Sequence, residues 1–257
     1  INDLNKIKAG KWYERSKVMD LVRSVQSTMG NYGYAYTSVE VQPRPNAADG
    51  IVDFTVMVNP GRKIYVNQIN IAGNNKTRDE VVRRELRQME NATYDQAKIT
   101  RSKERVQQLG YFDNVKVDAV PVPNSPDQVN LDMAMTERST GSIDAALGYV
   151  QDDGIVLSGG IAQDNLFGTG KSASLRLSNS ESSKAAALSF TDPYFTPDGV
   201  SLGYDVFYRE YDAREAEVSN YKTSTMGAGI RMGVPVTEYD RVNFGFTPEW
   251  MKLKLYD

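Results

Sequence analysis

The chain of 257 residues contains no cysteine and no histidine. Without histidine, Ser-His and Cys-His nucleophilic pairs, histidine general bases and most zinc sites are excluded. The absence of cysteine excludes disulfides and thiol chemistry, but it does not identify a redox compartment. The composition therefore predicts a protein that is not an enzyme, with no catalytic residue, no cofactor and no metal site.

Long apolar runs and basic stripes are also missing. No apolar run reaches the roughly 18 to 20 residues of a transmembrane helix, and no signal peptide opens the chain. The net charge is −3, and no basic stripe with interleaved aromatics indicates a nucleic-acid partner. The first residues start in the middle of a pattern, which predicts a processed protein or an excised fragment.

The first half of the chain contains an internal repeat. At an offset of 77 residues, Gly33-Tyr34 falls on Gly110-Tyr111, and the strand pattern around Val52 recurs around Val129. A helical pattern precedes each copy. The regular offset predicts two homologous α+β modules rather than an unrelated α+β region.

The second copy supplies the full order of elements. "KIYVNQINIAGNN" predicts a strand, and "KTRDEVVRREL" predicts a helix that Thr77 opens, with Glu80 at the capping-box spacing. A second helix is predicted over about Tyr94 to Leu109, and two strands follow it. The module is therefore β-α-α-β-β, and the first copy lacks its opening strand and much of its first helix.

From Ser142 onward, strict alternation of apolar and polar residues replaces the helical period. "KSASLRLSNS" is one of seven such segments, which short connections join. Alternation predicts strands with one apolar and one polar face, as in a soluble sheet or a transmembrane barrel. Aromatics gather near the strand ends in two belts, which favours the barrel. The belts are Phe167, Tyr194, Phe195 and Tyr239 on one side, and Tyr149, Tyr208, Tyr211 and Trp250 on the other.

Several motifs resemble one known family. Gly110 to Phe112, "PDQVNLDMAMTERSTGS", "QDNLFGTG" (Gln163 to Gly170) and "TDPYFTPDGVSLG" (Thr191 to Gly203) are similar, in this order and spacing, to the BamA family of outer-membrane protein assembly factors of Gram-negative bacteria. The resemblance covers the chain from end to end. It implies a POTRA module without its start at 1–61, the last POTRA module at 62–138, and the first seven strands of an outer-membrane β-barrel at 139–257.

The resemblance also implies a function and a location. The expected function is assembly and insertion of β-barrel proteins into the bacterial outer membrane, with the POTRA modules in the periplasm. The expected partners are BamD-like and other assembly lipoproteins, unfolded outer-membrane clients and outer-membrane lipid. The motif at Gly168 to Lys171 is expected to be a turn, since it lacks the spacing and the strand-to-helix setting of a phosphate loop.

Two sites follow from the resemblance. The first barrel strand is expected to form a weak seam that templates client strands, and its small residues suit that role, although they equally suit a crowded barrel wall. The seam residues are Ser142, Ile143, Asp144, Ala145, Ala146, Leu147, Gly148, Tyr149 and Val150. Arg83, Arg87 and Glu90 are expected on one helical face, as a docking surface for the BamD-like partner or as an ordinary solvated helix face.

Further alternatives remain at the level of sequence. Ser38 to Gln42 and Val115 to Val120 could accept a client strand by β-augmentation, or could be ordinary paired strands. A two-partner secretion or TamA-type transporter of the same superfamily is the nearest alternative function, and a passive porin is an alternative of another class. Seven strands would also leave two unpaired edges, near Ile143 to Val150 and Val242 to Lys252, which further sequence or self-association would have to satisfy.

Overall fold

The computed structural model describes residues 7, 10, 12–46, 50–151 and 154–256. The chain forms two compact units, Ile1–Asn75 with Val82–Glu137, and Lys76–Val81 with Arg138–Asp257. None of the described helices is both long enough and apolar enough to cross a membrane.

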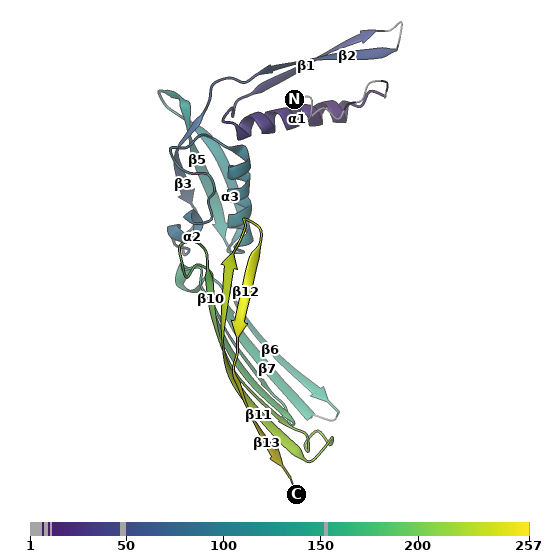
Figure 1. Ribbon diagram of the computed structural model, residues 1–257, viewed down its shortest axis with the longest axis vertical. Helices are drawn as coiled ribbons and strands as arrows, with labels where there is room; N and C mark the ends of the chain where they lie inside the picture. The colour runs from purple at the N-terminus through teal and green to yellow at the C-terminus, as the bar shows by residue number, and fades with distance from the viewer. Residues whose placement is uncertain (1–6, 8–9, 11, 47–49, 152–153, 257) are drawn as a thin grey trace. The chain divides into compact units, whose positions relative to one another are not determined.

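The first module pairs one helix with a two-stranded sheet. Helix α1 (Arg15–Asn31) lies along strands β1 (Ser38–Asn46) and β2 (Ile51–Asn59), which pair antiparallel (Figure 1). The helix buries Val18, Leu21 and Val25, which recur at helical spacing on its inner face. This burial fixes the helix on the sheet.

The second module has the predicted β-α-α-β-β order. Its elements are β3 (Tyr65–Ala72), α2 (Asp79–Arg83), α3 (Gln96–Gln108), β4 (Phe112–Val122) and β5 (Ser125–Glu137). Strand β5 lies in the centre of the sheet, parallel to β3 and antiparallel to β4. The apolar side chains between the sheet and α3 are buried, and they include Val66, Ile69, Val106, Val115, Val129, Leu131 and Met133.

The two helices of this module differ from the sequence prediction in length. Helix α3 begins close to the predicted start, where the Asp95 carboxylate accepts a hydrogen bond of 3.1 Å from the backbone N–H of Lys98. Helix α2 ends at Arg83, so the predicted helix through Leu86 is wrong in its second half. The chain tightens there into turns with bonds from the Glu85 N–H to the Val82 carbonyl and from the Leu86 N–H to the Arg83 carbonyl.

A hydroxyl group from α3 explains why the helix stops. The Ser102 hydroxyl oxygen accepts hydrogen bonds from the backbone N–H groups of Arg87, at 2.7 Å, and of Gln88, at 3.3 Å. Glu85 is buried beside α3, where its carboxylate lies 2.6 Å from Arg105. These tertiary contacts replace the hydrogen bonds that a continuing helix would have made.

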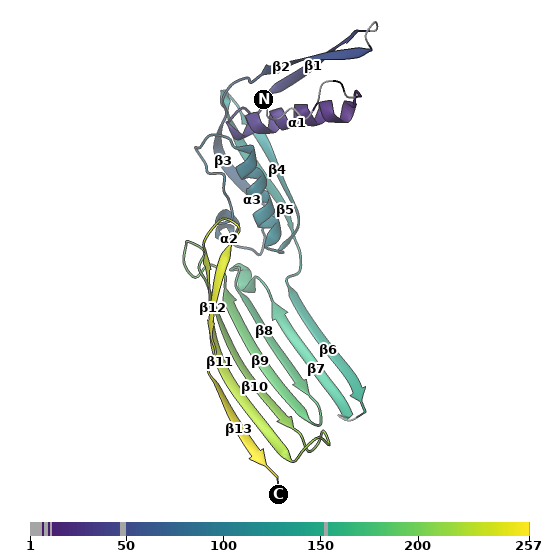
Figure 2. The ribbon, with the colours of Figure 1, turned by 45° about the vertical axis from the view of Figure 1, so that its right-hand side comes forward.

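The second unit is one antiparallel sheet of seven rows. Its strands are β6 (Gly141–Val150), β7 (Gly154–Gln163), β8 (Ser172–Asn179), β9 (Ser183–Asp192), β10 (Ser201–Asp212), β11 (Tyr221–Pro235), β12 (Arg241–Phe246) and β13 (Glu249–Leu255). Each strand pairs with its neighbour in the sequence, and β12 and β13 both pair with β11 (Figure 2). Pro248 interrupts this last row because proline has no N–H to donate.

The registers place the apolar residues of all rows on one face. Ile143 lies opposite Ile161, which lies opposite Leu175, and Leu175 lies opposite Leu188. The same row continues through Val206 and Ala228. These side chains stay exposed, with Ile143 at 82% and Leu188 at 53%. No described helix covers the face, which is the arrangement of a lipid-facing barrel wall. The leucines of the segment Ser172–Asn179 therefore point toward lipid.

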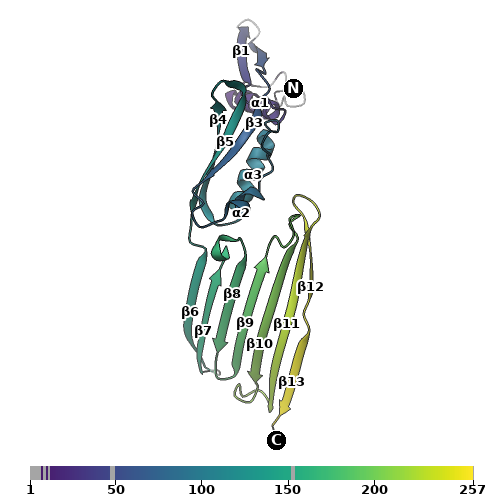
Figure 3. The same ribbon diagram turned by 90° about the vertical axis from the view of Figure 1, so that its left-hand side faces the viewer.

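The opposite face carries polar side chains that bond across strands. Arg231 on β11 donates to the Asp205 carboxylate on β10 and to the Ser189 hydroxyl oxygen on β9, the latter at 3.1 Å. The Ser189 hydroxyl in turn donates to Asp205 at 2.7 Å. Three central strands are thus joined on the polar face (Figure 3).

The aromatic belts are largely at the two ends of this sheet. Phe167, Phe195 and Tyr239 are exposed in the turns at one end, and Tyr149 and Trp250 are exposed on the apolar face toward the other. Tyr211 is the exception. Its register partner is Thr223, which puts it on the polar face.

The segment Lys76–Val81 packs against the turn between β7 and β8. This turn holds the short 3₁₀ helix η2 (Leu166–Gly168), and Asn165, Phe167, Gly168 and Gly170 all have positive φ. The Arg78 N–H donates to the Gly168 carbonyl at 2.9 Å, and the Asn165 amide donates to the Thr77 hydroxyl oxygen at 2.8 Å. The motif is a turn, as predicted, and it marks the end of the sheet that receives this segment.

Candidate functional site

Strand β6 is an edge strand along its whole length. It pairs with β7 from Gly141 to Val150, and among the described residues no strand pairs with its other side. On an antiparallel edge, every second residue directs its N–H and C=O groups away from the sheet. β6 therefore offers a continuous row of backbone donors and acceptors. All residues of the predicted seam, Ser142 to Val150, lie in this strand.

Side-chain contacts between β6 and β7 are few in the middle of the pair. Ala145 lies opposite Gly159, and Asp144 lies opposite Gly160. A β-carbon on Gly160 would lie 2.7 Å from an Asp144 carboxylate oxygen, so the Asp144 side chain covers that glycine. Cross-strand side-chain pairs supply much of the stability of a sheet, and here one partner has no side chain. At these two positions, backbone hydrogen bonds hold β6 with little help from packing, whereas Ile143 and Leu147 on either side lie opposite Ile161 and Leu157.

The opposite edge of the sheet is the interrupted row β12 and β13. Both strands pair with β11, and among the described residues neither has a second strand partner. The Pro248 carbonyl still accepts a hydrogen bond of 3.3 Å from the Ala228 N–H, which keeps the row in register across the interruption. The sheet thus has two unpaired edges, at β6 and at this row.

Arg83 and Glu90 act together on the edge of the second module. The Arg83 guanidinium lies 3.3 Å from the Glu90 carboxylate and donates to the Ile69 carbonyl at 3.3 Å. The same carboxylate accepts from the Ile69 N–H at 2.9 Å. Both side chains therefore hold the outer edge of β3. Their expected place on one helical face is wrong, because α2 ends at Arg83 and Glu90 lies in the connection to α3.

Arg87 is separate from this pair. Its backbone N–H is held by Ser102, and its guanidinium donates to the Leu86 carbonyl at 3.3 Å. Close in sequence, Met89 is 65% exposed. Sequence reasoning missed Met89 because a lone apolar residue in a non-helical segment has no periodic signal. We call Arg87 and Met89, which lie in the same connection between α2 and α3, the Arg87 surface.

The edges of the second module differ from each other. On β3, the Val66 N–H donates to the Ala92 carbonyl at 2.9 Å, and the Val66 carbonyl accepts from the Asn91 N–H at 2.7 Å. Together with the bonds at Ile69, these close the β3 edge. Among the described residues, β4 has no strand partner besides β5. The open edge of this module is therefore β4, which includes the predicted Val115 to Val120.

Tyr94 anchors the connection that closes the β3 edge. Its N–H donates to the Ile64 carbonyl at 2.9 Å, and its hydroxyl donates to the Gln96 side-chain oxygen at 2.5 Å. Burial raises the pKa of the Tyr94 phenol, and the nearby Tyr36 adds to the effect. The phenol therefore remains a neutral hydrogen-bond donor, and the connection stays fixed.

The described residues contain no cluster of three or more Asp and Glu that could hold a metal ion. What the arrangement offers is backbone hydrogen bonding at two open edges of the large sheet, at β4, and at the two-stranded sheet. Pairing of an incoming strand needs no covalent chemistry.

Comparisons with known proteins agree with this geometry. The Omp85 superfamily domain matches residues 165–257, and the POTRA family, described as surface antigen variable number repeat, matches residues 1–61 and 64–138. The chain is 61% identical over 253 residues to the outer membrane protein assembly factor BamA of Neisseria meningitidis serogroup B, covering 98% of the chain and 32% of that relative. The chain thus spans about a third of its length.

Solved structures show the same fold. BamA from Haemophilus ducreyi lacking POTRA domains 1–3 matches 98% of this chain and 48% of that chain, with a TM-score of 0.80 and 34% identity. CdiB from Acinetobacter baumannii matches all of this chain and 50% of its own, with a TM-score of 0.56 and 14% identity. At that identity the second likeness concerns the fold alone.

Proposed function

The chain belongs to the Omp85 superfamily and carries its POTRA modules, and on that premise we propose that the whole protein assembles β-barrel proteins in the bacterial outer membrane. The observation that carries this proposal is the β6 edge, which has no second strand partner among the described residues, on a sheet with a lipid-facing side. The sheet lies in the outer membrane and the POTRA modules lie in the periplasm. The assembly factors that the chain resembles support the same function.

We propose that the function is divided among three consecutive domains of the chain. We assign residues 1–61 to the penultimate POTRA module, 62–138 to the last one, and 139–257 to the opening strands of the barrel. The β-α-α-β-β order of the second module and the start of the sheet at Gly141 support these limits. A passive porin would account for the sheet, but it would leave the two POTRA matches without a role.

The β6 edge lowers the barrier that a client strand meets on entering lipid. An unpaired backbone group in hydrocarbon costs several kcal/mol, and a strand that pairs with β6 satisfies these groups before it leaves water. The outer side of β6, which no described strand pairs with, is the edge that can exchange partners. Binding and release are then both accessible without a cofactor or a catalytic residue.

The POTRA modules provide the water-side contacts. We propose that the Arg87 surface receives the BamD-like lipoprotein, with other assembly lipoproteins on neighbouring POTRA surfaces. We also propose that the open β4 edge receives unfolded clients by strand addition. The charge of the half-buried Arg87 and the exposed Met89 support the first assignment. Arg83 and Glu90 support it indirectly, since they hold the fold beside it.

A cysteine crosslinking experiment tests the seam. The chain has no cysteine, so Ala146→Cys introduces a single thiol on β6 of this region. Ala187→Cys on β9 is the matched control, because it lies on the same polar face but in an interior strand. The full-length protein with its other cysteines removed would be reconstituted in liposomes, and a client barrel with one cysteine in its terminal strand would be added.

The expected result is a disulfide from Ala146→Cys to the client during folding, and none from Ala187→Cys. A disulfide requires the two α-carbons to lie about 4.4 to 6.8 Å apart. The client strand and β6 come that close only when they pair. Client folding without any β6 crosslink, at every client position tried, would refute the templating role.

A further inference from the structure

The apolar face of the large sheet ends in a group of lysines. Lys184 on β9, Lys222 on β11, and Lys252 and Lys254 on β13 form what we call the lysine patch. Registers link its members, because Lys222 lies opposite Lys254, Lys184 lies opposite Glu210, and Lys252 lies opposite Ser224. The patch therefore spans the width of β9 to β13 over two adjacent levels of the sheet, with Lys184 and Lys252 at one level and Lys222 and Lys254 at the next.

The patch lies on the same face as the apolar residues. Lys184 is two positions from Ala186, and Lys252 is two positions from Trp250, so each lysine shares the face of its apolar neighbour. Two residues along a strand rise roughly 7 Å. The lysines therefore lie about 7 Å along the strands from the apolar residues, a distance comparable to the size of a lipid head group.

The charges in the patch are only partly compensated. The Glu210 carboxylate lies 2.6 Å from Lys222 and 4.0 Å from Lys184, and it accepts from the Tyr208 hydroxyl at 2.7 Å. The Asp212 carboxylate accepts from the Tyr256 hydroxyl at 2.8 Å. Within the described part of the chain, no carboxylate lies within ion-pair distance of Lys252 or Lys254. The patch therefore has an excess of positive charge.

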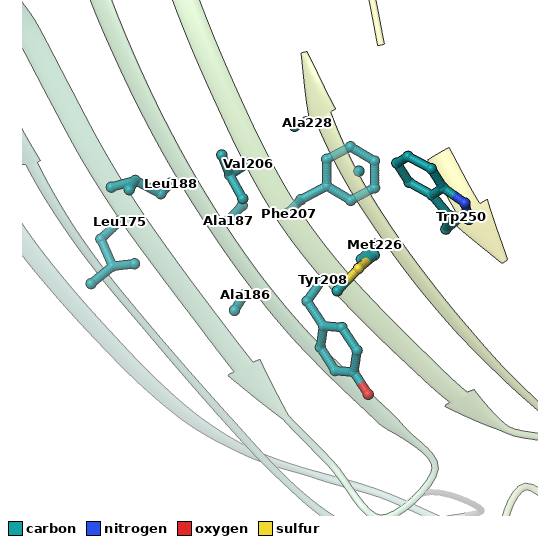
Figure 4. Close-up of a pocket in the computed structure, with 11 residues that line it drawn as sticks. Leu175, Ala186, Ala187, Leu188, Val206, Phe207, Tyr208, Met226, Ala228 and Trp250 are labelled. Atoms are coloured by element: carbon teal, nitrogen blue, oxygen red, sulfur yellow. The ribbon is translucent and has the colours of Figure 1, made fainter. Parts of the chain in front are cut away.

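A pocket of about 360 Å³ lies on the apolar face, and Figure 4 shows the residues that line it. One of them, Trp250, is two positions from Lys252 on β13. Ala186 and Ala228 form its shallow floor, because their neighbours in the surrounding rows are larger. The residues that line it include Leu175, Leu188, Val206, Tyr208, Met226 and Trp250. Tyr208 joins the two features, since its ring lines the pocket and its hydroxyl bonds to Glu210.

The sheet end that carries the patch is the one away from Lys76–Val81. That segment contacts the turn at Gly168, whereas Lys184, Lys222 and Lys254 lie at the opposite ends of their strands. With the POTRA side in the periplasm, the patch faces the outer leaflet. An apolar pocket in a membrane is reached by acyl chains, and an adjacent cationic row favours a lipid with an anionic head group.

We propose that the lysine patch and this pocket together bind one phosphate-bearing lipid of the outer leaflet. Its phosphate lies at Lys252 and Lys254, for which the described residues provide no carboxylate at ion-pair distance, and one acyl chain fills the pocket over Ala186 and Ala228. The inference rests on the membrane orientation given under the proposed function, but it does not depend on client assembly. The bound lipid would anchor the sheet edge at β13 in the outer leaflet.

The test measures lipid retained by the purified full-length protein. The protein would be reconstituted with lipid A, extracted in mild detergent, and analysed by native mass spectrometry, with no client present. The double variant Lys252→Gln/Lys254→Gln removes both positive charges from β13. Lys98→Gln/Lys116→Gln is the matched control, because it makes the same charge change in the POTRA module. Ala228→Leu fills the pocket floor without any change of charge.

We expect the double variant to lower lipid A retention about thirtyfold, since each of the two lysines near a lipid surface contributes about 1 kcal/mol. The control should retain lipid A as the wild type does, and Ala228→Leu should lower retention severalfold. Equal retention of dephosphorylated lipid A by the wild type, or equal retention of lipid A by the double variant, would overturn the inference. Protein that retains lipid A but folds no client would leave it standing and refute the proposed function.

Discussion

The two large sheets of the chain have similar alternating sequences and opposite surroundings. In the POTRA sheet, the apolar side chains of β3, β4 and β5 are buried, and Val66 and Val129 are 0% exposed. In the barrel sheet, Leu147 and Phe246 are both 75% exposed. The difference comes from what the chain places between strands, since helices separate β3 from β4 whereas turns and a single 3₁₀ turn separate β6 from β13. A sheet without a helical cover needs lipid as its apolar partner.

The largest expected effect comes from separating the two sheets. Residues 1–138 should fold in aqueous buffer without lipid, because both modules carry helices that cover their sheets. Circular dichroism should show mixed α and β content with one cooperative melting transition. A signal that needs detergent or that melts without cooperativity would contradict the comparison.

Single aspartate substitutions should destabilise the two sheets differently, because the apolar side chains of one are buried in protein and those of the other face lipid. Val129→Asp places a charge in the POTRA core and should destabilise the module by about 4 kcal/mol. Leu188→Asp on the lipid face should cost about 2 kcal/mol, and only when the protein is in lipid. Ala187→Asp, its neighbour on the polar face, is the control and should change stability by less than about 1 kcal/mol.

These aspartate effects would be measured by urea unfolding of the full-length protein in lipid vesicles. Protease resistance of the POTRA region would report Val129→Asp separately. A larger cost for Ala187→Asp than for Leu188→Asp would mean that the faces have been assigned the wrong way round.

The contact between Lys76–Val81 and the β7–β8 turn should depend on one glycine. Gly168 has φ +73°, and a β-carbon there would lie 2.0 Å from the Lys76 carbonyl oxygen. Gly168→Ala should therefore cost about 2 to 3 kcal/mol and release the segment, through backbone strain and the clash together. Gly110→Ala is matched, because Gly110 also has φ +73° but nothing lies within 4 Å of the added carbon.

Hydrogen exchange at Arg78 gives the direct readout, since its N–H donates to the Gly168 carbonyl. Faster exchange in Gly168→Ala with wild-type exchange in Gly110→Ala is the expected outcome. If both variants exchange as the wild type does, the contact does not hold the segment.

A second glycine tests packing on the polar face of the barrel sheet. The Phe207 ring lies across Gly227, where a β-carbon would approach a ring atom to 2.5 Å. Gly227→Ala should cost about 1 to 2 kcal/mol by displacing the ring. Gly245→Ala should be nearly neutral, because its nearest contact would be 3.9 Å. Thermal unfolding in lipid would compare the stability of the two variants. Adding Phe207→Leu to Gly227→Ala should restore part of the lost stability.

The sequence predicted most of this fold because its signals were local. Alternation and short turns predicted the sheet, and the offset between Gly33 and Gly110 predicted the two modules. Helix α2 was predicted too long because its end depends on Ser102, a residue from α3 that periodicity cannot bring into view. The face of the sheet on which Tyr211 lies likewise depends on the pairing of β10 with β11. Long-range hydrogen bonds decided both points.

For the candidate sites too, local features were predictable from the sequence and long-range contacts were not. The β6 edge was predictable, because strands that pair with their neighbours in sequence leave the first one unpaired. The closed β3 edge was not predictable, because Glu90, Asn91 and Ala92 reach it from a connection without regular structure. For the same reason, the shared role of Arg83 and Glu90 on that edge emerged only from the structure.

The smallest expected effect concerns Arg87, a half-buried residue in the same connection as the exposed Met89. Arg87→Glu should weaken docking of the BamD-like partner about fivefold at low salt, roughly 1 kcal/mol, and leave the module folded, because a charge at an interface rim affects association more than stability. Arg83→Glu should instead lower the stability of the module, since Arg83 holds Glu90 and the Ile69 carbonyl. Arg23→Glu on the exposed side of α1 is the control for net charge. Titration of the purified partner against each full-length variant would measure affinity, and unchanged affinity in Arg87→Glu at low salt would remove this surface from the docking site.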